Sequence, residues 1–160
     1  MSKPFGIAFA AAVVVIVIVV WTGFVRTAGN HLAPTGSIGK VRTVKASDEL
    51  TYMVIDFNVK NDSDRDMIVR SVEGVVDTAG GSVTGSPVAA ADVAAAFKNY
   101  PLLGEQYNPV LKERDVIPAH GFVDRMVGLR IDAPYETVDA RKRVTLRVQD
   151  VTGPVVELTK

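Results

Sequence analysis

The sequence contains no cysteine and only two histidines among its 160 residues. Without cysteine, the chain has no disulfides, no thiol nucleophile and no cysteine-rich metal site. A zinc site needs two or more converging ligands, and neither His31 nor His120 occurs in a spacing such as H-E-x-x-H. We therefore interpret both histidines as exposed residues of a tether and a turn, and we expect no cofactor.

The sequence also lacks an excess of charge of either sign. Its 18 lysines and arginines balance its 18 aspartates and glutamates. A nucleic-acid-binding protein needs a basic field that neutralises phosphates, and none is present here. We expect no nucleic-acid partner.

Charge is missing altogether from one long stretch, Phe5–Val25. As a helix rising about 1.5 Å per residue, these 21 residues span about 30 Å, which is the thickness of a bilayer's hydrocarbon core. Trp21 and Arg26 close the stretch with an interfacial aromatic and a cation. The apolar run is longer than that of a cleaved signal peptide. The sequence therefore predicts an uncleaved, single-pass transmembrane anchor.

Within this anchor, small residues recur four positions apart, in the pairs Gly6/Ala10 and Ala8/Ala12. Such spacing allows close helix packing and makes these four residues candidates for a partner contact, although alanine is also common in anchors. We expect residues 1–26 to form the tail and anchor. The Gly- and Pro-containing residues 27–39 read as a tether, and residues 40–160 as a β-sandwich domain.

The β-sandwich prediction rests on short segments of alternating polarity. In Leu50–Lys60 the apolar residues Met53, Ile55, Phe57 and Val59 share one face, and Asp56 is expected on the solvent face. Similar patterns, separated by turn residues, predict further strands and a mainly antiparallel sandwich. The further predicted strands are Met67–Asp77, Phe122–Ile131, a run through Val144, Leu146 and Val148, and Val155–Leu158.

One Ala-rich helical insertion is expected to interrupt the strands. Ser86 is predicted as its N-cap, Pro87 as its first residue and Val88–Asn99 as its body, lying over a sheet edge or sandwich end. Its end and the residues after it carry a dense apolar cluster, which is interpreted either as a lid packed on the sandwich or as an exposed partner-contact surface; its members are Phe97, Tyr100, Leu102, Leu103 and Tyr107.

Several of these features occur together in one known group of domains. The strand ending Val59-Lys60-Asn61, the following polar turn and Asp77-Thr78-Ala79-Gly80 resemble bacterial membrane-anchored immunoglobulin-like domains of unassigned function, including the telokin-like and LEA14-like families. Ile117-Pro118-Ala119-His120-Gly121 is similar to their later Ile-Pro-Pro-Gly turn, with Ala119-His120 in place of the usual pair. The resemblance implies an immunoglobulin-like fold anchored in the bacterial inner membrane, outside the cytoplasm, and it brings no catalytic residues.

One carboxylate cluster has the spacing of a calcium loop. Asp62, Asp64, Asp66 and Glu73 fall at positions 1, 3, 5 and 12 of such a loop, but Met67 stands where the motif requires glycine. The alternative interpretation is a solvated hairpin turn.

No nucleophile–base or metal constellation is evident, so we expect a protein that is not an enzyme. The favoured interpretation is an accessory or assembly subunit of a membrane protein complex, with integral membrane proteins as partners. The alternative is an extracytoplasmic ligand-binding or calcium-dependent adhesion module.

Overall fold

The computed structural model describes residues 13–22 and 34–160, and the chain divides into the units Met1–His31 and Leu32–Lys160. Residues 13–22 are helical. No helix within the described ranges has both the length and the apolar character needed to cross a membrane. The anchor predicted over Phe5–Val25 lies largely outside these ranges, as do Gly6, Ala8, Ala10, Ala12 and most of the tether. The anchor remains a prediction.

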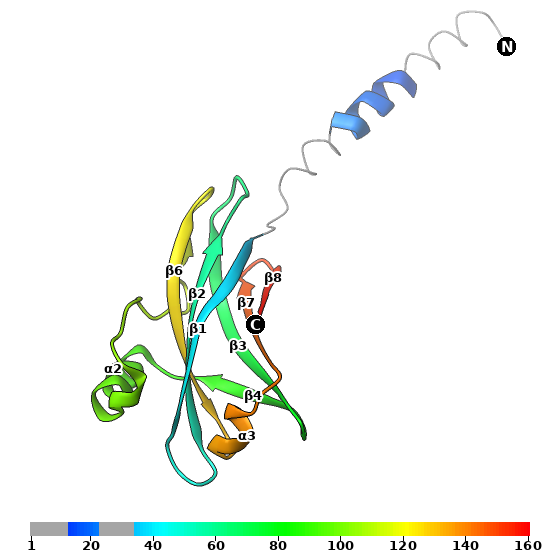
Figure 1. Cartoon of the computed structure of the whole chain (residues 1–160). Coiled ribbons are helices and arrows are strands. Elements are labelled where there is room, and N and C mark those ends of the chain that lie inside the picture. Colours follow the sequence, from blue (N-terminus) through cyan, green and yellow to red (C-terminus); the bar gives the residue numbers. More distant parts are fainter. Residues whose placement is uncertain (1–12, 23–33) are drawn as a thin grey trace, which may run out of the picture. The chain divides into compact units, whose positions relative to one another are not determined.

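The second unit is a mainly antiparallel β domain, as predicted (Figure 1). Its strands are hydrogen-bonded in the order β1-β2-β6-β4-β3-β7-β8, and the short β5 pairs with β3. The strand bounds are β1 Thr35–Lys45, β2 Thr51–Lys60, β3 Met67–Thr78, β4 Gly81–Pro87, β5 Val116–Ile117, β6 Phe122–Ile131, β7 Arg143–Asp150 and β8 Val155–Thr159.

The main core lies between the two halves of this sheet. The half made by β1, β2 and β6 packs its inner face against the half made by β3, β7 and β8, while β4 pairs with both β3 and β6. The inward parity predicted for β2 is confirmed, because Met53, Ile55, Phe57 and Val59 are all buried in this core. The predicted inward residues of β7 are buried there too.

The domain begins earlier than the sequence predicts. Residues 35–39, which the prediction placed in the tether, form the first part of β1. This part pairs with the end of β2, where the backbone nitrogen of Ser37 donates to the side chain of Asn58. Gly36 is required here, because a Cβ at that position would lie 2.2 Å from the carbonyl oxygen of Asn58.

The predicted helix start is also wrong. Ser86 and Pro87 are the last residues of β4, and Ser86 pairs with Arg130 of β6. The helix α2 (Ala90–Asn99) begins after them, with Ala89 at the N-cap and no side-chain cap. A residue before proline favours extended backbone, so Ser-Pro suits the end of a strand as well as the start of a helix.

Two short helical segments complete the fold. The 3₁₀ helix η1 (Pro101–Leu103) follows α2 directly, and α3 (Tyr135–Asp139) connects β6 to β7. The helix α2 packs on the outer face of β6 rather than over an edge or end, because Gly128 leaves room there for Val93. Figure 1 shows α2 standing outside the sheet.

Candidate functional site

Residues 88–111, here called the lid, cover the outer face of β1, β2 and β6. They comprise α2, η1 and a loop whose Val110 bridges to Met126 of β6. The lid and the sheet beneath it enclose a second buried apolar cluster, separate from the main core, made of Val44, Val54, Val93, Ala96, Leu103, Val110 and Met126. The strand β2 is therefore buried on both faces, and Val54, which interrupts its alternation, is buried under the lid.

A buried ion pair fastens the lid to the sheet. Nη2 of Arg42 on β1 lies 2.6 Å from Oδ2 of Asp56 on β2, and the two side chains are only 6% and 10% exposed. Nη1 of Arg42 donates to the carbonyl oxygens of Leu103 and Glu105, at 2.7 and 2.8 Å. Asn108 donates to the other oxygen of Asp56 at 3.0 Å. Arg42 thus binds η1 and the loop that follows it, and Asp56 binds that loop.

The position of Asp56 corrects the sequence prediction. Strand alternation placed this residue on a solvent face, whereas the structure buries it under residues of the lid. The prediction was wrong because alternation separates the two faces of a strand but does not reveal whether a distant segment covers the outer one. Burial of two charges carries a desolvation cost, which the hydrogen bonds from Asn108 and to the lid carbonyls offset in part, since Nε of Arg42 is buried with no hydrogen-bond partner among the described residues.

Aromatic rings of the lid surround the guanidinium of Arg42. Its central carbon lies 4.9 Å from the centroid of the Phe97 ring and 5.8 Å from that of Tyr107. The ammonium of Lys40 lies 6.0 Å from the same Tyr107 ring. Cations over aromatic faces are attracted by the ring quadrupole, so these rings add to the attachment of the lid.

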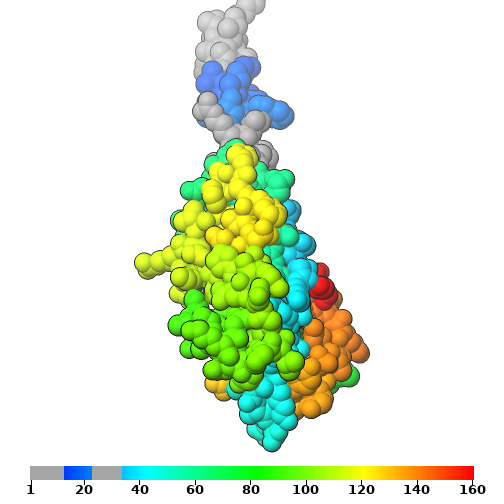
Figure 2. Space-filling model, turned by 60° about the vertical axis from the view of Figure 1, so that its left-hand side comes forward, coloured from blue at the N-terminus to red at the C-terminus, as the bar shows by residue number. Residues whose placement is uncertain are grey.

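The predicted apolar cluster is divided between the inside and the outside of the lid. Leu103 is 1% exposed, and Phe97 and Tyr100 pack against the second cluster. Leu102 is 91% exposed and Tyr107 66% exposed. The packed-lid interpretation thus holds for Phe97, Tyr100 and Leu103, while a partner contact at the exposed Leu102 and Tyr107 stays a prediction. Figure 2 shows the lid, coloured green to yellow-green, in the middle of this face of the domain.

The candidate calcium ligands are not brought together. Asp62 pairs with Lys60 at 2.7 Å. Nε2 of His120 lies 2.9 Å from Asp64, and Asp66 accepts a hydrogen bond from the backbone of Ala119.

The fourth candidate lies apart from the other three. Glu73 is on β3, where it faces Arg147 at 3.9 Å, because the strand that begins at Met67 carries it away from the turn. Within residues 13–22 and 34–160, no group of three or more acidic or histidine side chains is placed to hold a metal ion.

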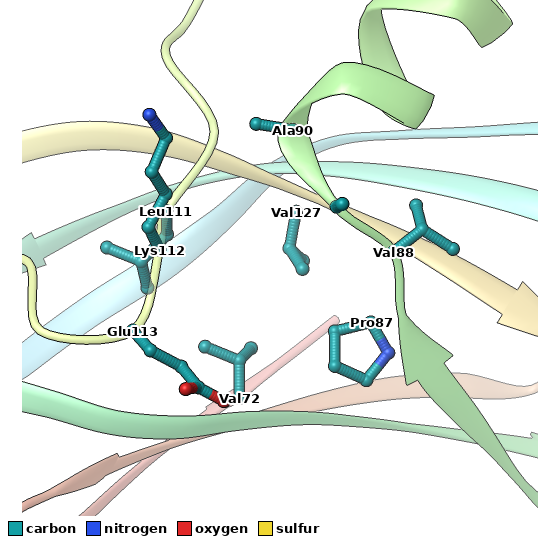
Figure 3. A pocket seen from close by; sticks show the side chains of 9 residues that line it. Val72, Pro87, Val88, Ala90, Leu111, Lys112, Glu113 and Val127 are labelled. Atoms are coloured by element: carbon teal, nitrogen blue, oxygen red, sulfur yellow. The ribbon is translucent and has the colours of Figure 1, made fainter.

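The structure also contains a pocket that the sequence did not reveal. It has a volume of about 370 Å³ and lies between β3 and β6 at the start of the lid (Figure 3). Its lining comes from four separate parts of the chain, so no local pattern marks it; the residues are Val72, Pro87, Val88, Ala89, Ala90, Leu111, Lys112, Glu113 and Val127.

No protein family model and no curated protein matches this chain. Among solved structures, the chain is similar to the archaellum periplasmic stator protein FlaG from Sulfolobus acidocaldarius, with 9% identity, a TM-score of 0.36, and coverage of 80% of this chain and 100% of that one. It is also similar to an uncharacterized β-sandwich protein from Clostridium difficile 630, with 16% identity, a TM-score of 0.31 and 81% of each chain covered. A third is the ApaA protein from Bordetella pertussis, with 13% identity, a TM-score of 0.37, and coverage of 81% of this chain and 89% of that one. At these scores the likenesses carry no argument about function.

Proposed function

We propose that this chain is a non-catalytic, single-pass membrane protein that displays an immunoglobulin-like β-sandwich and acts as an accessory or assembly subunit of a membrane protein complex. In this proposal Phe5–Val25 anchors it in a bacterial inner membrane, with the β domain outside the cytoplasm. The support for anchoring is the length of that segment and its lack of charge. Residues 26–34 precede β1 and span at most about 30 Å when extended, so the domain stays within reach of membrane-embedded partners.

The partner-binding part of the proposal is supported by two exposed residues on a lid that is bound to the sheet. Leu102 and Tyr107 expose apolar and aromatic surface, while Arg42 holds the backbone between them through the carbonyl oxygens of Leu103 and Glu105. A surface that is already ordered loses little conformational entropy on binding. Aromatic residues are also enriched at protein interfaces. Leu102 and Tyr107 are therefore the proposed partner contacts.

A second candidate function is ligand binding, and the pocket beside the lid favours it. Apolar pockets of roughly 300–1,000 Å³ with a few polar groups are typical of small-molecule sites. The calcium-dependent form of this alternative is not favoured, since the four candidate carboxylates have separate partners.

The test uses the full-length chain extracted from its own membranes in mild detergent. After an alkaline wash, the protein should stay in the membrane fraction at full length. The wild type should then co-purify with specific integral membrane proteins, and a Leu102→Ser variant should lose them while its melting temperature stays close to that of the wild type, because the Leu102 side chain is exposed. A soluble, shortened protein would contradict the anchor, and unchanged co-purification would contradict the proposed contact surface.

A further inference from the structure

The pocket beside the lid has a mostly apolar interior. Val72 of β3 and Val127 of β6 form its floor, and Pro87, Val88 and Leu111 stand around it (Figure 3). The floor belongs to the main core, because Val127 is buried in it and Val72 packs against it. An apolar chain entering the pocket would thus contact the inner surface of the sandwich, where water has few hydrogen-bonding partners.

The charges around this pocket are not symmetric. Figure 3 shows the carboxylate of Glu113 beside Val72, while the side chain of the neighbouring Lys112 extends the other way and carries its amino group away from Val72 and Pro87. An anionic group would therefore be repelled at one end of the pocket and attracted at the other.

A second, more open hollow continues the pocket on the lysine side. Ala90 and Lys112 line both hollows, and Arg125 of β6 lines the second one. Within the described part of the chain, neither Lys112 nor Arg125 takes part in an ion pair. The carboxylate of Asp115, which also lines this hollow, accepts a hydrogen bond from the backbone nitrogen of Lys112 at 2.9 Å. Lys112 thus stands where the two hollows meet, and Arg125 lines the more open one.

We propose that this pocket binds a single-chain anionic amphiphile. The alkyl chain lies on Val72 and Val127, and the head group, a carboxylate or a phosphate, lies between Lys112 and Arg125. Among the described residues that line the more open hollow, the two cations Lys112 and Arg125 outnumber the one carboxylate, Asp115, and so favour an anionic head there, and the carboxylate of Glu113 excludes that head from the far end. The site is distinct from Leu102 and Tyr107, so it does not depend on partner docking through the lid.

The test is photolabelling of the full-length chain in phosphatidylcholine nanodiscs, with peptide mapping by mass spectrometry. Three photoreactive probes have twelve carbons each and differ in their heads: dodecanoate, dodecyl phosphate and dodecanol. We expect adducts on residues 87–90 and 111–113, about tenfold more abundant for an anionic probe than for dodecanol, as a charge-assisted contact predicts. Comparison of the two anionic probes shows whether a fatty acid or a phosphate ester is the better ligand.

Two kinds of variant separate binding from folding. Val72→Trp fills the pocket and should abolish these adducts, whereas Val75→Trp, on the other face of the same strand, should keep them. Lys112→Ala and Arg125→Ala alter side chains at the mouth and should reduce labelling by the anionic probes to the level of dodecanol. Equal labelling by all three probes, or labelling that neither Val72→Trp nor Lys112→Ala changes, would overturn the proposal. Failure of the anchor would instead appear as loss of the chain from the nanodiscs.

Discussion

Arg42 and Asp56 form a buried ion pair on the outer face of two adjacent strands, and both side chains also bind the lid. A buried pair contributes little net stability compared with apolar residues, but removal of one partner leaves the other charge buried and uncompensated. The pair therefore fixes where the lid lies on the sheet.

We expect Asp56→Ala and Arg42→Ala each to lower the free energy of unfolding by about 3–5 kcal/mol, the cost typical of breaking a buried pair. Chemical denaturation followed by circular dichroism measures this change. The matched control is Arg130→Ala, which removes an exposed pair with Asp132 and should cost at most about 1 kcal/mol. If Asp56→Ala costs no more than the control, the ion pair does not fasten the lid.

Gly128 provides the second attachment of the lid, through close contact with α2. A Cβ at this position would lie 2.5 Å from Cγ2 of Val93 and 2.9 Å from Cγ2 of Val88. Gly128→Ala should therefore displace α2 and cost about 1–3 kcal/mol by overpacking.

Truncation of Val93 should restore part of the stability lost in Gly128→Ala, since it removes the closest clashing atoms. Gly80→Ala is the control for Gly128→Ala, because a Cβ at position 80 would have its nearest atom 3.9 Å away and so would meet no clash. A purely additive loss in the Gly128→Ala/Val93→Ala double variant would show that the two residues do not share this contact.

The stability of the domain should fall in acid through Asp150 at the end of β7. Burial acts to raise the pKa of this carboxyl, but hydrogen bonds from the hydroxyl and backbone of Thr152 and from the backbone of Ile68 outweigh it and hold the pKa below its usual range. A carboxyl with a lowered folded-state pKa stabilises the fold above its unfolded pKa of about 4, and this contribution is lost as pH falls through and below that value.

Denaturation measured between neutral pH and roughly pH 3 tests this, because an Asp150→Asn variant should be less stable at neutral pH and lose less stability on acidification than the wild type. A variant with the same pH dependence as the wild type would exclude Asp150 as a source of the acid sensitivity.

The inner half of this fold could be predicted from the sequence because it depends on local alternation. In β2, every second residue faces the main core as predicted; these residues are Met53, Ile55, Phe57 and Val59. The outer face could not be predicted in the same way. Whether Asp56 contacts water or Arg42 is decided by a segment about 50 residues further along the chain, and strand periodicity carries no information about that segment.

The first strand was missed for a different reason. Gly36, Ser37 and Gly39 give residues 35–39 the composition of a linker, and only Ile38 among them is buried. Their strand conformation comes from pairing with the end of β2, and this is a tertiary effect that composition does not show. In the lid, the sequence identified the apolar cluster but could not divide it, since the orientation of Leu102 and Leu103 depends on how η1 meets the sheet.

We propose above that Leu102 and Tyr107, the exposed residues of the lid, contact a membrane protein. The most direct measurement places a photo-crosslinking amino acid at Leu102 in the full-length chain within its native membranes, and at Ala79 in the exposed turn between β3 and β4 as the control. We expect one discrete adduct with an integral membrane protein from position 102 and none from position 79. No adduct at position 102, or the same adduct from both positions, would contradict the proposed function.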